Sequence, residues 1–250
     1  MTAKIALITG ASAGIGFEAA RQLGKQGITV LVGARSQASA DQAAGRLQEE
    51  GIQAADIELE VTNAAHIEQA AKLIVKEYGR LDILINNAGV WAEKGDSAGG
   101  SPGAPNAASA SGGDPFRQTF EVNTLAPYYL TEALLPLLLK SEAGRIVNQS
   151  SALGSINFML SNELAQRIAT PAYAASKAAL NMLTAYWSQK FKDTRLKVNS
   201  VHPGLVKTKM GGDKAELTPE EGAKTAVRLA TLPEDGPTGG FFYMDDVLPW

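Results

Sequence analysis

Short apolar runs alternate with longer amphipathic stretches along most of the chain. The runs rich in Ile, Val and Leu predict strands at 5–9, 28–34, 54–59, 81–86, 145–150, 196–201 and 240–244. Helical spacing of apolar residues predicts helices near 14–26, 37–50, 63–78, 114–140, 172–192 and 219–231. Nearly continuous apolar strands that alternate with helices are typical of a parallel sheet covered on both faces. We therefore predict a single α/β domain over residues 1–250, built on a doubly wound parallel sheet of about seven strands.

Two segments interrupt this alternation. Residues 92–113 are Ala, Gly, Ser or Pro at all but four positions, and we expect this stretch, poor in large apolar groups, to form a flexible surface loop. Residues 152–172 carry several large apolar side chains, and two readings stay open: a lid or pocket wall, or packing against the core. Pro127 and Pro136 predict a kink or break in the helix at 114–140.

Composition narrows the class of protein and of partner. With 45% apolar and 20% charged residues the chain can bury a sizeable core, and its net charge of −3 argues against nucleic acid or an anionic membrane as a main partner. The absence of cysteine excludes disulfides and a cysteine nucleophile, and the two histidines, His66 and His202, do not suggest a metal site. No apolar run approaches the ~20 residues that span a bilayer, and no basic leader precedes the first strand, so we expect a cytoplasmic protein.

A glycine-rich turn, Thr-Gly-Ala-Ser-Ala-Gly-Ile-Gly over residues 9–16, joins the first predicted strand to the first helix. Glycines allow a tight turn and leave room for a pyrophosphate, and the helix that follows points its N–H groups at the phosphates. We therefore expect a dinucleotide-binding loop of the Rossmann type. The residues expected to line it are Gly10, Ser12, Gly14, Ile15 and Gly16.

Tyr173 and Lys177 stand four residues apart in a predicted helix, so their side chains share one face. An ammonium near a phenol stabilises the phenolate and lowers the phenol pKa from about 10, so the pair can exchange a proton with a substrate oxygen near neutral pH. Tyr186 and Lys190 repeat this spacing but face roughly 220° away, at about 100° per residue. They also lack the small neighbours that leave room for a flat cofactor, so the first pair is the catalytic candidate.

Ser151 comes directly after the strand predicted at 145–150. Parallel sheets bind ligands beyond the carboxyl ends of their strands, so a hydroxyl at this place can meet a ligand, although serine is also a common turn residue.

These motifs together resemble those of the short-chain dehydrogenase/reductase family. Six of them occur in order along almost the whole chain, namely TGxxxGIG at 9–16, NNAG at 86–89, Asn123, Ser151, YxxxK at 173–177 and PGxxxT at 203–208. The ending at 238–242 and the long interval from serine to tyrosine are more similar to the carbonyl-reductase-type branch.

The resemblance implies NADPH-dependent reduction of a small-molecule ketone or aldehyde to an alcohol. Tyr173 would give its proton to the carbonyl oxygen as hydride arrives from the nicotinamide. Lys177 would bind the nicotinamide ribose and hold down the tyrosine pKa. Ser151 would hydrogen-bond the substrate oxygen, and Asn123 would position a water that returns the proton.

The resemblance also implies a set of binding residues. Thr208 is expected on the nicotinamide carboxamide, and Asn87, Ala88 and Gly89 along the adenosine, while Asn86 or Asn87 also ties neighbouring strands. Further cofactor contacts are expected from Ser36, Val61, Pro203, Gly204 and Val206. The expected substrate contacts, besides Ser151 and Tyr173, are Trp91, Leu153 and Phe158.

Arg35 points to the choice of cofactor. It lies nineteen residues after Gly16 (35 − 16), about where an NAD-specific fold places an acid on the adenosine ribose. Ala34 has no such carboxylate to repel a phosphate. Arg35 can donate two charge-assisted hydrogen bonds to a 2′-phosphate. We therefore predict NADPH/NADP+, against the alternative that Arg35 is an exposed charge at the start of a helix.

Two features depart from the family pattern. Twenty-two residues separate Ser151 from Tyr173 (173 − 151), more than usual, and the extra residues are expected near the substrate mouth. Because such a segment can cover a helix face used for association, we expect a monomer or a homodimer. Glu60 stands where relatives often carry aspartate near the adenine, and it either accepts from the adenine amine or caps the next helix.

Two other functions stay open at this point. An NAD(P)-dependent alcohol dehydrogenase that works mainly in the oxidative direction would carry the same residues. A cofactor-sensing protein without turnover tends to lose the tyrosine or the lysine, and both are present here, so this function is less favoured.

Overall fold

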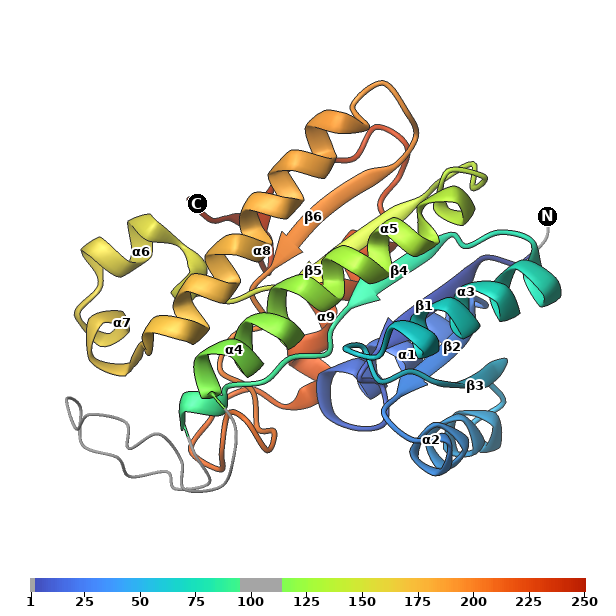
Figure 1. The fold of residues 1–250 in the computed structure, drawn as a ribbon, viewed down its shortest axis with the longest axis horizontal. Helices are drawn as coiled ribbons and strands as arrows, with labels where there is room; N and C mark the ends of the chain where they lie inside the picture. Colours follow the sequence, from blue (N-terminus) through green and yellow to red (C-terminus); the bar gives the residue numbers. More distant parts are fainter. Residues whose placement is uncertain (1–2, 95–113) are drawn as a thin grey trace.

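The computed structural model describes residues 3–94 and 114–250. Most of the predicted flexible loop, residues 95–113, lies outside the described residues. Over the described ranges the chain forms one sheet between two layers of helices (Figure 1).

Eight strands of the described residues form this sheet, in the order β3-β2-β1-β4-β5-β6-β7-β8. Their bounds are β1 Ile5–Thr9, β2 Thr29–Ala34, β3 Ala54–Glu58, β4 Ile83–Asn86, β5 Arg145–Gln149, β6 Lys197–Val201, β7 Phe241–Tyr243 and β8 Asp246–Val247. Neighbouring strands pair in parallel as far as β7, and β8 pairs antiparallel with β7. The seven predicted strands are confirmed. The eighth was not predicted, because a strand this short gives no periodicity.

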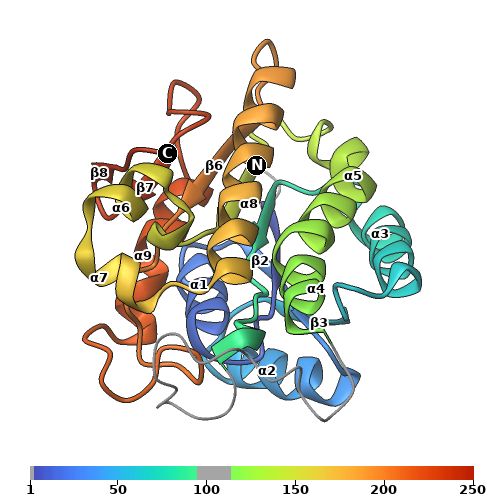
Figure 2. The same ribbon diagram turned by 60° about the vertical axis from the view of Figure 1, so that its left-hand side comes forward.

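The helices cover both faces of the sheet. One face carries α1 (Gly14–Gly24), α2 (Gln37–Glu49) and α9 (Pro219–Ala230), and the other carries α3 (Ala64–Tyr78), α5 (Ala126–Leu138) and α8 (Pro171–Lys190). Figure 2 shows these two layers from the side. Each layer packs on its own cluster of buried apolar residues, which confirms the predicted doubly wound sheet.

The helix predicted at 114–140 changes to a π turn just before Pro127, whereas α5 continues through Pro136, so only one of the two prolines lies at an irregularity. α4 (Pro115–Phe120) runs through a π turn, η2 (Glu121–Leu125), into α5. Pro127 has no N–H to donate to the Asn123 carbonyl four residues earlier, so the regular hydrogen-bond ladder is interrupted at that residue. Single π turns inside helices often mark functional sites, and this one contains Asn123.

The segment 152–172 folds into three short helices, η3 (Ala152–Gly154), α6 (Ile156–Ser161) and α7 (Glu163–Ile168). The last residues of the chain hold it in place. The Ser155 hydroxyl donates to the Pro249 carbonyl at 2.8 Å, and the Asn157 N–H donates to the Trp250 carbonyl at 3.2 Å. The segment therefore packs against α8 and the residues that follow β8.

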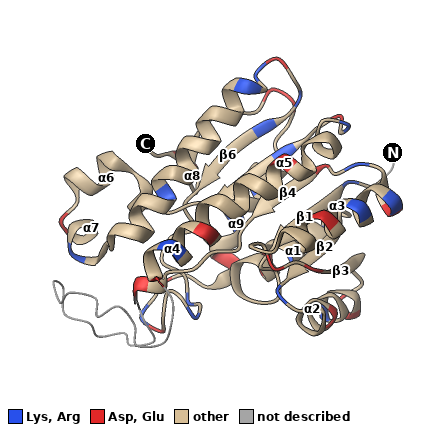
Figure 3. Cartoon of the chain, in the orientation of Figure 1, with Lys and Arg blue, Asp and Glu red and all other residues tan. Residues whose placement is uncertain are grey.

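The described residues carry positive and negative charges side by side. Figure 3 shows Lys and Arg interspersed with Asp and Glu along the helices. No helix in the described ranges has the length and apolar character needed to cross a membrane. The same ranges contain no group of three or more His, Asp or Glu side chains arranged to hold a metal ion.

Candidate active site

The four residues expected to carry the reaction lie together at the carboxyl edge of the sheet. Ser151 comes just after β5, Tyr173 and Lys177 lie in the first two turns of α8, and Asn123 lies in η2. The Thr124 hydroxyl holds η2 against α8 by donating to the Ser176 carbonyl at 2.9 Å. All four candidates are at most 8% exposed, so water has little access to them.

The Tyr173 side chain is enclosed on several sides. Its ring stacks on that of Trp91 with a centroid distance of 4.4 Å and an interplanar angle of 15°. Its hydroxyl lies 3.9 Å from the Met210 sulfur. Burial raises the pKa of Tyr173 to about 12, and a hydrogen bond with Ser151 opposes this rise.

The expectation that the Tyr173 pKa is lowered is therefore wrong for this structure. The Lys177 Nζ lies 5.8 Å from the centre of the tyrosine ring and donates instead to the Gln149 carbonyl at 2.7 Å. Loss of hydration outweighs the ammonium at that distance, so the phenol stays protonated at neutral pH.

Lys177 itself titrates unusually. Burial lowers the pKa of its ammonium from 10.5 to about 8. The unfolded chain holds this proton up to about 10.5, so between these two values the unfolded state binds more protons and folding stability rises with pH. The shift corresponds to roughly 3 kcal/mol.

We expect this pH dependence to appear in urea denaturation. The free energy of unfolding of the native chain, relative to Lys177→Met, should rise by roughly 3 kcal/mol as the pH increases from about 8 to about 10.5. Lys190→Met, which removes an exposed lysine from the end of the same helix, serves as the control. A flat difference for Lys177→Met, or an equal rise measured against Lys190→Met, would contradict the assignment.

The Asn123 side chain is fully buried and makes three hydrogen bonds. Its amide group donates to the Val90 carbonyl at 2.8 Å and to the Ser176 hydroxyl at 3.1 Å, and its Oδ1 accepts from the Val90 N–H at 2.8 Å. These bonds fix the segment after β4 against α8. Among the described residues, the Asn123 Oδ1 accepts only the hydrogen bond from the Val90 N–H and keeps a second lone pair, so the water expected on Asn123 stays a prediction.

The expected substrate residues surround Tyr173. Leu153, Ala165 and Tyr173 form a buried apolar cluster, and a second set of partly buried residues packs against it. That second set is Trp91, Phe158, Met159, Ala169 and Met210. Because η3, α6 and α7 supply much of this cluster, the segment 152–172 packs against Tyr173, and its role as a lid or pocket wall stays a prediction.

The glycine loop packs tightly against the end of β4. Asn87 Nδ2 donates to the Thr9 carbonyl at 2.8 Å and to the Gly10 carbonyl at 3.2 Å. Gly10 has a φ of +62°, and a Cβ there would lie 3.0 Å from the Ala88 Cα, so only glycine fits. Asn86 Nδ2 donates to the Asn148 Oδ1 at 2.8 Å and ties β4 to β5, as expected for this motif.

The N-terminus of α1 suits an anion. Ala13 precedes the helix without a side-chain cap, and the first turn has no acidic residue. The N–H groups of this turn remain available, and the helix dipole favours a negative charge there. Thr208 lies close to this turn, since its methyl group would lie 3.4 Å from a Cβ on Gly14. These features fit the pyrophosphate of a dinucleotide.

Arg35 lies just beyond the end of β2, next to the glycine loop. The Ala11 N–H donates to the Gly33 carbonyl at 3.0 Å, so the loop runs beside the last residues of this strand. Arg35 is exposed, and the ion pairs found in residues 3–94 and 114–250 do not include it. Ser36 is the N-cap of α2 and accepts from the Ser39 N–H at 3.4 Å.

Glu60 does not cap the next helix, so one of its two readings is wrong. Asn63 caps α3 instead, with its Oδ1 accepting from the Ala65 N–H at 2.9 Å. Glu60 precedes α3 by too many residues to reach the first N–H groups of the helix. Its carboxylate accepts instead from the Thr62 hydroxyl at 3.2 Å. Contact between Glu60 and an adenine stays a prediction.

Three residues around Tyr173 were not found from the sequence. Met210 follows the PGxxxT motif, and Glu93 and Thr170 contact the start of α8. Thr170 precedes Pro171 at a helix start, which is a recognisable capping signal. Glu93 has no sequence signal, because its partners lie some eighty residues away.

The second Tyr–Lys pair lies on the surface, as predicted. Tyr186 is 55% exposed, and the Lys190 Nζ lies 5.7 Å from the centre of its ring.

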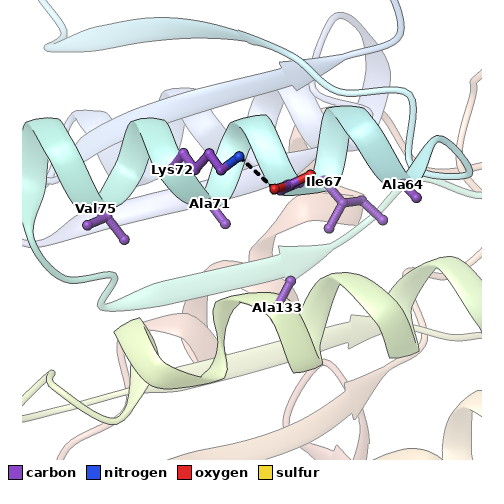
Figure 4. Close-up of a pocket in the computed structure, with 7 residues that line it drawn as sticks. Ala64, Ile67, Ala71, Lys72, Val75 and Ala133 are labelled. Carbon is purple, nitrogen blue, oxygen red and sulfur yellow. Dashed lines mark ion pairs between the residues drawn. The ribbon is translucent and has the colours of Figure 1, made fainter.

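An apolar groove of about 510 Å³ lies away from the candidate site, between α3 and α5 (Figure 4). Lys72 pairs with Glu68 at 2.6 Å along this groove, and none of the candidate catalytic residues lines it.

The sequence and the fold of this chain are similar to those of known proteins. Residues 4–218 match the family model of short chain dehydrogenases. The chain is 32% identical to (+)-neomenthol dehydrogenase of Arabidopsis thaliana, over 96% of each protein. Its fold is similar to salutaridine reductase from Papaver somniferum (TM-score 0.79, 31% identity, 96% of this chain and 99% of that one). It is also similar to NADPH-bound carbonyl reductase from chicken fatty liver (TM-score 0.79, 29% identity, 100% of both chains).

Proposed function

The chain belongs to the short chain dehydrogenase family, and from this premise we propose that it reduces a ketone or aldehyde to an alcohol with NADPH. The observation that supports this most is the state of Tyr173. Its hydroxyl is buried, protonated, hydrogen-bonded with Ser151 and set inside an apolar cluster. A neutral phenol in that setting is an acid placed to protonate a carbonyl oxygen.

Each residue has a distinct role in this proposal. The Ser151 hydroxyl holds the carbonyl oxygen beside Tyr173, which donates its proton. Lys177, anchored by the Gln149 carbonyl, is one turn of α8 away and stabilises the phenolate that remains. Asn123 keeps the segment after β4 in register with α8.

The cofactor proposal rests on the residues that would hold it. NADPH supplies the hydride when bound. The uncapped start of α1 and Gly10 to Gly16 fit its pyrophosphate, and the exposed Arg35 fits a 2′-phosphate. The chicken carbonyl reductase with the same fold has NADPH bound.

We also propose a direction and a substrate class for the reaction. A phenol that is protonated at neutral pH can donate to the carbonyl oxygen during reduction, and the same group serves as the base in oxidation. The proposed direction therefore rests on NADPH as the hydride source and not on this pKa. The cluster of Trp91, Leu153, Phe158 and Met210 around the hydroxyl favours an apolar carbonyl compound.

The test is to follow NADPH absorbance with a panel of aromatic, alicyclic and aliphatic ketones and aldehydes. We expect oxidation of NADPH with apolar carbonyls and much less with polar ones. Alcohols with NADP+ form a second arm, and NADPH titration without substrate a third. Turnover only in the alcohol arm would assign the oxidative function, and tight NADPH binding with no turnover in either arm would assign a cofactor-sensing function.

A further inference from the structure

Glu93 makes an unusual contact with the helix that carries Tyr173. It lies in η1 (Ala92–Lys94), a short turn after β4, and its partly buried carboxylate faces the first turn of α8. One oxygen, Oε2, accepts from the Thr170 hydroxyl at 2.6 Å and from the Tyr173 N–H at 2.9 Å. Thr170 is the N-cap residue of α8 but makes no side-chain cap bond of its own. Glu93 thus supplies the cap of α8 from a distant part of the chain.

A second contact closes the arrangement into a ring. The Trp91 Nε1 donates to the Thr170 hydroxyl at 2.6 Å, while the Trp91 indole stacks on the Tyr173 ring. Thr170 uses its single hydroxyl proton on Glu93 and accepts from Trp91, so all three hydrogen bonds are mutually consistent. Tyr173 is therefore held at two places, its backbone N–H by Glu93 and its ring by Trp91.

From this geometry we propose that Glu93 is a positioning residue for proton transfer by Tyr173. It holds the backbone of the tyrosine directly and its ring through Thr170 and Trp91. The proposal rests on the proposed role of Tyr173 as the proton donor. A reacting group displaced by about 1 Å can lose on the order of 10²-fold in rate. A negative group at a helix N-terminus is also stabilising, so the carboxylate suits this position electrostatically.

Two substitutions separate hydrogen bonding from charge. Glu93→Ala removes the acceptor altogether, so the Thr170 hydroxyl and the Tyr173 N–H lose their shared partner. Glu93→Gln keeps one side-chain oxygen that can accept from both donors, because in the native chain both bonds reach the same atom. The amide should therefore restore most of what alanine loses.

α9 offers a closely matched control. There the Glu221 Oε2 accepts from the Thr218 hydroxyl at 3.1 Å and from the Thr218 N–H at 2.8 Å. Glu221→Ala removes the same pair of bonds from the start of a helix that carries none of the candidate catalytic residues. It reports the cost of losing such a cap without the effect on Tyr173.

The experiment measures kcat, KM, the Kd for NADPH and Tm for these three variants, with Tyr173→Phe assayed in parallel. We expect Glu93→Ala to lower kcat roughly tenfold or more, Glu93→Gln to stay near the native value, and Glu221→Ala to lower Tm without lowering kcat. The Kd for NADPH should be unchanged in all three. Equal kcat in Glu93→Ala and Glu221→Ala, or an equal loss in Glu93→Gln and Glu93→Ala, would overturn the positioning role. If Tyr173→Phe retained full activity, the proposed function would fail first, so the two failures can be told apart.

Discussion

Tyr173→Phe is expected to abolish carbonyl reduction and to leave NADPH binding almost unchanged. Phenylalanine keeps the ring that stacks on Trp91 and packs in the apolar cluster, so the fold and the cofactor site should survive. Only the hydroxyl is lost, and with it the acid that protonates the carbonyl oxygen. Positioned acid catalysis contributes about 10²- to 10⁴-fold, and kcat should fall by at least that factor. The measurements are steady-state kinetics and the Kd for NADPH by fluorescence titration.

Tyr186→Phe is the matched control for this prediction. It makes the same change on the same helix, in a pair with the same spacing to a lysine, but on the exposed face. Its kcat and KM should stay within about twofold of the native values, as for most surface substitutions. If Tyr186→Phe lost activity and Tyr173→Phe kept it, the active site would have been assigned to the wrong pair.

The fold and the grouping of the candidate site residues could be predicted from the sequence because local patterns encode them. The strands are apolar runs whose ends are set by Gly, Asn and Ser, and β1 begins and ends where its pattern predicts. The YxxxK spacing puts Tyr173 and Lys177 on one face of α8 whatever the rest of the chain does. The parallel sheet then brings Ser151 and the glycine loop to the same edge.

Properties that depend on packing could not be predicted in this way. The pKa of Tyr173 was expected to fall because Lys177 is close in sequence, but burial by Trp91, Met210 and the 152–172 segment raises it. Burial is set by distant parts of the chain, so sequence spacing does not report it. Glu93 shows the same limit, since its contact with the start of α8 exists only in the folded chain.

The choice between NADPH and NADH provides the second strong prediction. Arg35 is exposed beside the glycine loop and belongs to no ion pair of the described ranges, so its guanidinium is available to a phosphate. A hydrogen bond to a charged group is worth roughly 1.5–3 kcal/mol, which is about 10- to 150-fold in affinity. Arg35→Ala should weaken NADPH binding by about this factor and leave NADH almost unchanged, because NADH has no 2′-phosphate. Titration of both cofactors gives the two Kd values.

Two further variants sharpen this test. Arg46→Ala removes an exposed arginine from α2, the helix that follows Arg35, and should affect NADPH and NADH equally. Adding Ala34→Asp to Arg35→Ala places a carboxylate at the end of β2 and should turn the preference toward NADH. Ala34 is only 1% exposed, so this second change also lowers stability, and the ratio of the two Kd values is the proper readout. Equal weakening of both cofactors in Arg35→Ala would rule out recognition of the 2′-phosphate by Arg35, because a contact with the parts shared by both cofactors cannot discriminate between them.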